Sequence, residues 1–117
     1  MELDKEMRIY DTFSPDIYFT TVVYRSGKPE NGLNIIVSVI DLLDNSEILS
    51  QAMPEIGATG YYKTLWQPTF TEKKNLFARV YVDDGNKQKI LGTVDIIVNN
   101  NRFLLEEKID ENDGLAI

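Results

Sequence analysis

Short runs in which apolar and polar side chains alternate recur along this chain, separated by residues that favour turns. The runs cover residues 17–25, 61–67, 76–83 and 90–99, and they are rich in β-branched and aromatic side chains. Successive side chains of a strand point to opposite faces, so a period of two predicts strands rather than helices. Many short strands with turns between them are typical of a sandwich or barrel, and we expect an all-β chain of six or seven strands.

The longest apolar run covers residues 33–43 and reads LNIIVSVIDLL. A period of two fits it better than a helical period, and Ile and Val favour strands. Residues 84–86 (Asp-Gly-Asn) predict a hairpin turn into 90–99, which we expect to be the last strand. Residues 47–53 fit either a short strand or one helical turn, which Pro54 ends.

The two ends of the chain differ from this pattern. Residues 1–15 are charged, and they predict an N-terminal arm or a short edge strand before a sandwich over residues 16–99. At 102–111 the apolar residues have helical spacing, with Leu105 four positions before Ile109, and the preceding Asn residues can cap a helix. Residues 100–117 are therefore expected to form a short C-terminal extension that is helical or flexible.

Composition narrows the classes of function. The length of 117 residues indicates one domain, and the net charge of −7 disfavours binding to nucleic acid or to anionic membranes. The sequence contains no cysteine and no histidine, so it can form neither a disulfide nor a Ser-His-Asp triad. It also lacks an apolar run of the roughly 20 residues that a membrane-spanning helix needs, and its N-terminus has no apolar signal-peptide segment. We expect a protein that is not an enzyme and that uses no cofactor or metal.

Three groups of residues stand at the turns and strand ends of this pattern: Ser26-Gly27-Lys28-Pro29 before Gly32-Leu33; Met53-x-Glu55-Ile56-Gly57 before Gly60-Tyr61-Tyr62; and Trp66-Gln67-Pro68 before Phe77-x-Arg79-Val80-Tyr81. Together they resemble immunoglobulin-like β-sandwich modules of the filamin and invasin type, over roughly residues 16–99. The resemblance implies an immunoglobulin-like sandwich of about seven strands. Such modules occur in structural proteins of phages and archaeal viruses and in surface adhesins.

Several side chains could bind a ligand. Oxygen-bearing side chains at 83–86, and at Asp41, Asp44, Asn45 and Glu47, could approach Ca²⁺, but both groups also suit turns, which is the interpretation we favour. Tyr61, Tyr62 and Trp66 could form a platform for a carbohydrate or peptide. Aromatic rings dominate sandwich cores, so core packing is the favoured interpretation for these three as well.

The alternation also predicts an apolar outer face. If one set of side chains on 33–43, 76–83 and 90–99 faces the core, the other set points outward on neighbouring strands: Ile36, Ile40, Phe77, Tyr81, Leu91 and Ile97. A contiguous exposed apolar surface usually marks a contact. The C-terminal residues Phe103, Leu104 and Leu105 could extend this interface, or could fold back and cover it.

These features favour a structural or binding protein. The resemblance to viral modules indicates a virion component, such as a capsid decoration, a spike or a tail-associated protein. Its expected partner is another copy of itself, or a capsid, tail or cell-surface protein, and its expected location is the virion or an extracellular surface. The alternatives are a module of a prokaryotic surface adhesin or stalk, and a carbohydrate-binding module. Neither nucleic-acid binding nor membrane insertion is expected.

Overall fold

The computed structural model describes residues 7–12, 16–70, 72–99 and 102–109, and ten β-strands account for most of them. The strands are β1 (Met7–Thr12), β2 (Ile17–Val22), β3 (Tyr24–Arg25), β4 (Lys28–Pro29), β5 (Ile35–Asp41), β6 (Ser46–Ala52), β7 (Tyr61–Trp66), β8 (Lys74–Asp83), β9 (Gln88–Asn99) and β10 (Arg102–Ile109). The prediction of an all-β chain is confirmed for these residues. The ambiguous segment 47–53 lies almost wholly in strand β6.

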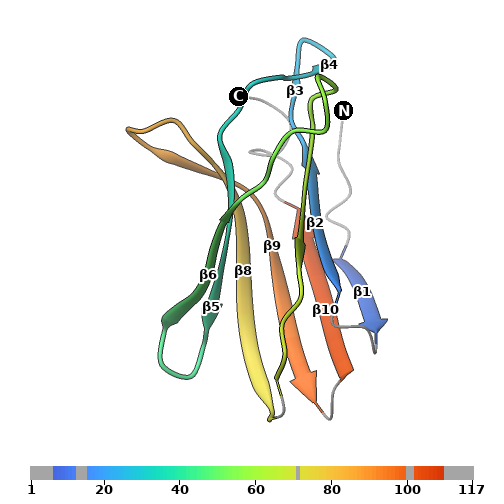
Figure 1. The fold of residues 1–117 in the computed structure, drawn as a ribbon, viewed down its shortest axis with the longest axis vertical. Helices are drawn as coiled ribbons and strands as arrows, with labels where there is room; N and C mark the ends of the chain where they lie inside the picture. The colour runs from blue at the N-terminus through green and yellow to red at the C-terminus, as the bar shows by residue number, and fades with distance from the viewer. Residues whose placement is uncertain (1–6, 13–15, 71, 100–101, 110–117) are drawn as a thin grey trace.

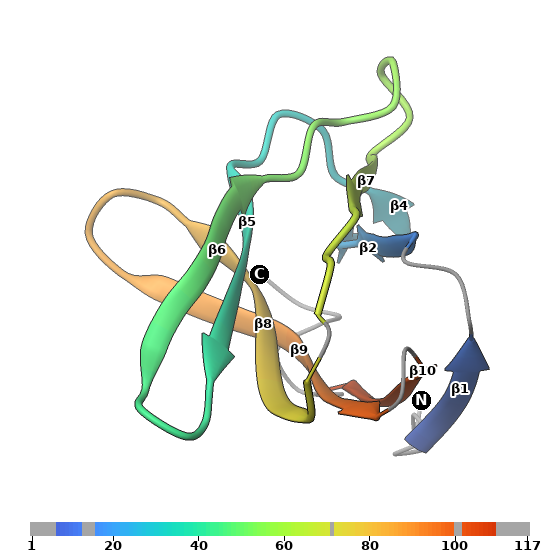
Figure 2. The ribbon, with the colours of Figure 1, turned by 60° about the horizontal axis from the view of Figure 1, so that its bottom comes forward.

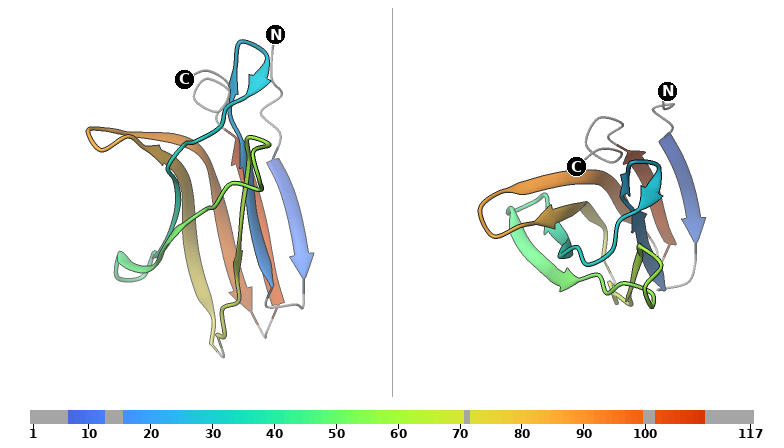
Figure 3. Two further views of the ribbon diagram at one scale, coloured as in Figure 1. Left: turned by 45° about the horizontal axis from the view of Figure 1, so that its top comes forward. Right: turned by 90° about the horizontal axis from the view of Figure 1, so that it is seen from above.

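Six strands form one antiparallel sheet in the order β1-β10-β9-β8-β5-β6 (Figure 1). A second sheet contains β2 and β7, and β3 pairs with β4 in a short hairpin. Figure 2 shows the large sheet curving around the β2–β7 pair, so the two sheets form two layers. The β8–β9 hairpin extends away from the rest of the molecule (Figure 3).

The prediction that the three apolar strands are neighbours is confirmed. Strand β8 lies between β5 and β9, and its register places Tyr81 opposite Ile36 and Phe77 opposite Ile40. Side chains of opposite residues in an antiparallel pair lie close together on one face. The register therefore determines which side chains form each face of the sheet.

The predicted C-terminal helix is wrong. Residues Arg102–Ile109 form β10, which pairs with β9 along its whole length. A helix this short is marginal on its own, whereas the free edge of β9 offers a backbone partner for each residue of β10. Strand β1 then pairs with β10, as the predicted edge strand, so the sheet extends beyond residues 16–99 on both sides. The remaining parts of the predicted arm and extension lie outside the described residues.

The core lies between the two sheets. The large sheet contributes fully or almost fully buried aliphatic side chains, and the small sheet adds Ile17, Phe19 and Tyr62. Burying each large apolar side chain contributes on the order of 1.5–3 kcal/mol. The main contributors from the large sheet are Ile35, Val37, Val39, Leu76, Ala78, Ile96, Val98 and Leu105.

A β-bulge changes the face of one predicted surface residue. The register between β8 and β9 shifts after Val80, so that Val80 lies opposite Gly92 while Tyr81 lies opposite Ile90. Leu91 is the extra residue on β9, and it packs in the hydrophobic core. The outward position predicted for Leu91 is therefore wrong, because strict alternation does not hold across a bulge.

Candidate interaction surface

One end of the sandwich is held together by Tyr62. Its ring is buried, with 1% exposure, and its hydroxyl donates to the Glu30 carbonyl at 2.8 Å and accepts from the Leu33 N–H at 3.0 Å. The backbone of Gly60 passes close to the same loop, and a Cβ there would lie 2.5 Å from Pro29 Cβ. Burial raises the pKa of the Tyr62 phenol. This tyrosine therefore fastens the loop between β4 and β5 to β7.

The carboxylate of Glu55 joins the same two segments. It accepts from the N–H of Gly32 at 3.0 Å and from the N–H of Gly60 at 2.9 Å. Nearby, Arg25 Nε lies 2.7 Å from Glu30 Oε1. Most polar groups at this end of the molecule satisfy one another, as is usual in structural turns, whereas Glu30 Oε2 is buried without a hydrogen-bond partner.

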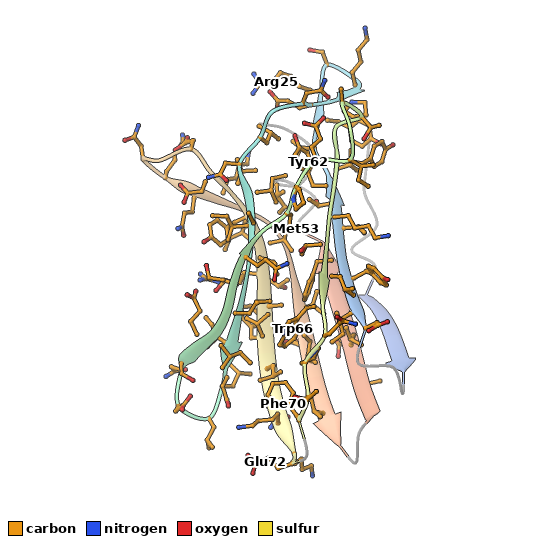
Figure 4. The ribbon with its side chains drawn as sticks, viewed as in Figure 1. Arg25, Met53, Tyr62, Trp66, Phe70 and Glu72 are labelled. Carbon is orange, nitrogen blue, oxygen red and sulfur yellow. The ribbon has the colours of Figure 1, made fainter. Side chains whose placement is uncertain are left out.

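The structure does not bring the three predicted platform rings together on one exposed face. Trp66 packs beside Phe19, with ring centroids 6.3 Å apart, and meets Phe70 edge-on. Tyr62 faces the core as well, whereas Tyr61 points to the opposite face of β7 and is 45% exposed. Figure 4 shows Tyr62, Trp66 and Phe70 in succession along the long axis of the molecule. Core packing, the favoured interpretation for all three rings, is confirmed for Tyr62 and Trp66 and is wrong for Tyr61, because alternation along β7 turns Tyr61 outward.

The two candidate calcium clusters are turns. Asp84 Oδ1 accepts from the backbone N–H groups of Asn86 and Lys87, and these bonds hold the pKa of Asp84 below its usual value. Asp44 Oδ1 accepts from the N–H and the hydroxyl of Ser46, which lowers the pKa of Asp44. Within the described part of the chain, no group of three or more acidic side chains is placed to hold a metal ion.

Asp41 is the buried carboxylate of the large sheet. Lys74 Nζ lies 3.1 Å from Asp41 Oδ2, and this hydrogen bond raises the pKa of Lys74. The second oxygen, Oδ1, accepts from the N–H of Leu43 at the start of the β5–β6 turn. Both oxygens are occupied, so Asp41 is a structural residue at the end of β5.

The face of the large sheet that points away from β2 and β7 carries apolar side chains on four of its strands. Ile97 is 40% exposed and lies opposite Leu104, which is 38% exposed. We call the apolar residues of this face the outer apolar surface: Ile36, Ile40, Phe77, Tyr81, Ile90, Ile97 and Leu104. Leu105 packs in the core instead, and the side chain of Phe103 lies outside the described part of the structure.

A polar row crosses the middle of this face. Ser38 lies opposite Arg79 on β8, and Arg79 lies opposite Thr93 on β9. Ser38 donates its hydroxyl to Glu47 Oε2 at 2.6 Å. Arg79 was missed as a candidate residue, although the alternation of 77, 79 and 81 on one face could have identified it.

Most of the predicted interface residues thus lie on one face of the large sheet. Those on β5 and β8 are partly or largely covered by their neighbours, and the exposed part of the surface is centred on β9 and β10. Ile90 was missed because the bulge shifts its face.

In the residues that the structure describes, no helix is long and apolar enough to cross a membrane.

Comparison of the chain with models of known protein families, with curated proteins and with solved structures gave no match.

Proposed function

We propose that this protein is a non-enzymatic structural protein that assembles with copies of itself through the outer apolar surface. The observation that carries the proposal is the exposed pair formed by Ile97 and Leu104, which lies on the same face as the apolar residues of β5 and β8. Contact between apolar surface and water is unfavourable, so covering these side chains with a second surface lowers the free energy.

The order of the strands supports the immunoglobulin-like assignment. In such sandwiches the G, F, C and C′ strands are neighbours in one sheet, while the B and E strands pair in the other. Here β9-β8-β5-β6 follow one another in the large sheet and β2 pairs with β7 in the small one. Strands β1 and β10 add two strands at the G edge, which lengthens the outer face.

The resemblance to modules of viral structural proteins supports the placement of this assembly on a virion, as a decoration, spike or tail-associated component. The proposed location is the virion surface or another extracellular surface. The absence of histidine and cysteine supports a role without catalysis, because the commonest general base and the thiolate nucleophile are both missing.

The test is the solution mass of the whole chain, measured by light scattering over a range of concentrations. We expect an oligomer, and we expect the double variant Ile97→Ser/Leu104→Ser to raise its dissociation constant by about tenfold or more, since two exposed apolar contacts are lost. Both side chains are already partly exposed, so the variant should fold.

Leu43→Ser is the matched control. Leu43 is 89% exposed and lies in the β5–β6 turn, away from the outer apolar surface, so its replacement should leave the mass unchanged. A chain that is monomeric at every concentration, or an oligomer that the double variant does not weaken, contradicts the proposed function.

A further inference from the structure

The polar row of the outer face holds a cation without an anionic partner. Among the described residues Arg79 forms no ion pair, and its Nε is buried without a hydrogen-bond partner. Its guanidinium instead leans along β8, with Cζ 5.9 Å from the centre of the Tyr81 ring. A buried donor without an acceptor costs free energy, and the positive charge of the guanidinium favours a nearby carboxylate.

The same face carries two acids beside this cation. Asp95 on β9 lies opposite Glu106 on β10, so two like charges are cross-strand neighbours. Such a pair is destabilising when the residues lie directly opposite each other. Asp95 is exposed and lies opposite Phe77, two pairs along the ladder from Arg79 and Thr93 and on the same face. On the β9 and β10 side of Arg79 the outer face is therefore negative, and on its β5 side the Glu47 carboxylate accepts from Ser38, the residue opposite Arg79.

From this arrangement we infer that two copies of the chain pack face to face about a two-fold axis, with Arg79 of each copy bound to Asp95 of the other. This inference rests on the proposed function and specifies its contact. In face-to-face packing the two-fold axis lies in the interface and divides the face into two halves. Each half then contacts the other half of the face on the second copy. A two-fold axis that passes between Arg79 and Asp95 makes both charge contacts at once.

The net charge of the chain favours this arrangement over a contact made by apolar residues alone. Each copy carries −7, so two copies repel each other at long range. A local pairing of opposite charges offsets this repulsion and determines the orientation in which the faces meet. The apolar residues on either side of the polar row then exclude water from the two ion pairs, which strengthens them.

Charge reversal tests the contact. In Arg79→Asp, two acids face each other in the dimer, and in Asp95→Arg two arginines do. We expect each variant alone to raise the dissociation constant of the dimer by about a hundredfold, because attraction becomes repulsion at both symmetric contacts. Asp95 is exposed, so Asp95→Arg carries little risk to folding, and circular dichroism checks both variants.

An equimolar mixture of the two variants is the decisive measurement. In the mixture, one copy carries an acid at both positions and the other carries arginine at both, so both contacts are restored between unlike copies. Light scattering should show dimers in the mixture and monomers in each separate sample. Lys28→Asp, an equal change of sign in the β3–β4 hairpin, should dimerise like the wild type.

The outcomes separate this inference from the proposed function. If Ile97→Ser/Leu104→Ser weakens the oligomer but the charge-reversed chains still associate separately, the Arg79–Asp95 contact is wrong and assembly through this face stands. Failure of the mixture to dimerise, with both variants folded, also overturns the contact. If the wild-type chain never associates, both proposals are overturned, and any occupant of the outer face must be a different protein.

Discussion

At the scale of single residues, a few polar side chains determine the paths of the loops. Tyr62 illustrates this best, because one hydroxyl satisfies both a carbonyl and an N–H of the loop that leads into β5. Glu55 does the same for Gly32 and Gly60. The Tyr62 contacts join segments about 30 residues apart in sequence, and sequence patterns do not reveal them.

Tyr62→Phe should destabilise the protein by about 1–3 kcal/mol, because the Glu30 carbonyl and the Leu33 N–H lose their partner while the ring stays in place. Urea unfolding measures the change. Tyr18→Phe is the control: Tyr18 lies on an exposed position of β2, and the change should stay within about 0.5 kcal/mol. Equal effects of the two changes would contradict the role assigned to the Tyr62 hydroxyl.

The turn carboxylate of Asp84 predicts a dependence on pH. Its folded-state pKa lies below the unfolded value near 3.8, so the stability it contributes is present above that pH and is lost as the pH falls through the folded value. Asp84→Asn keeps an acceptor that does not titrate. We expect urea unfolding of the wild type to lose more stability than the variant between about pH 6 and pH 2.5. Parallel losses in the two proteins would contradict this.

At the scale of elements, β10 shows how a sheet edge overrides local pattern. The sequence RFLLEEKI fits a short helix, yet pairing with β9 places Leu105 opposite Ile96 in the core and Leu104 opposite Ile97 on the outer face. The strand thus points the side chains of two consecutive leucines to opposite faces of the sheet, whereas consecutive side chains of a helix do not point in opposite directions. The bulge at Val80 similarly overrides the alternation predicted for Leu91.

This separation predicts unequal effects of two alanine substitutions. Leu105 belongs to the core cluster and is 9% exposed. Leu105→Ala should lower the free energy of unfolding by about 2–3 kcal/mol, because the change leaves a cavity. Leu104→Ala should cost about 1 kcal/mol or less in the monomer. Chemical denaturation at low protein concentration measures both. Similar losses for the two variants would be inconsistent with β10 as a strand.

At the scale of the whole molecule, the small β2–β7 sheet depends on the large one. A two-stranded sheet is marginal in water by itself. Here it contributes Ile17, Phe19 and Tyr62 to the shared core. The Gln51 side chain adds a polar link, since its Nε2 on β6 donates to Thr64 Oγ1 on β7. The two layers should therefore unfold together.

The single tryptophan makes this testable. Trp66 reports on the small sheet through its fluorescence, while far-ultraviolet circular dichroism reports mainly on the large sheet. We expect both signals to change at the same urea concentration. Val39→Ala, a buried change in β5 of the large sheet, should shift both curves equally. A tryptophan transition at lower urea, separate from the dichroism, would show that the layers unfold independently.

Sequence patterns alone predict the all-β class, the positions of the main strands, and the outward-facing residues Ile36, Phe77 and Ile97. These follow from alternation and from turn residues, which act over a few positions of the chain. Pairing between distant strands, in contrast, makes 102–109 a strand, buries Leu91, and puts Arg79 and Asp95 on one face without an ion pair between them. Local patterns carry no information about these features, because edge pairing, bulges and neighbouring charges all depend on the register between strands that are distant in sequence.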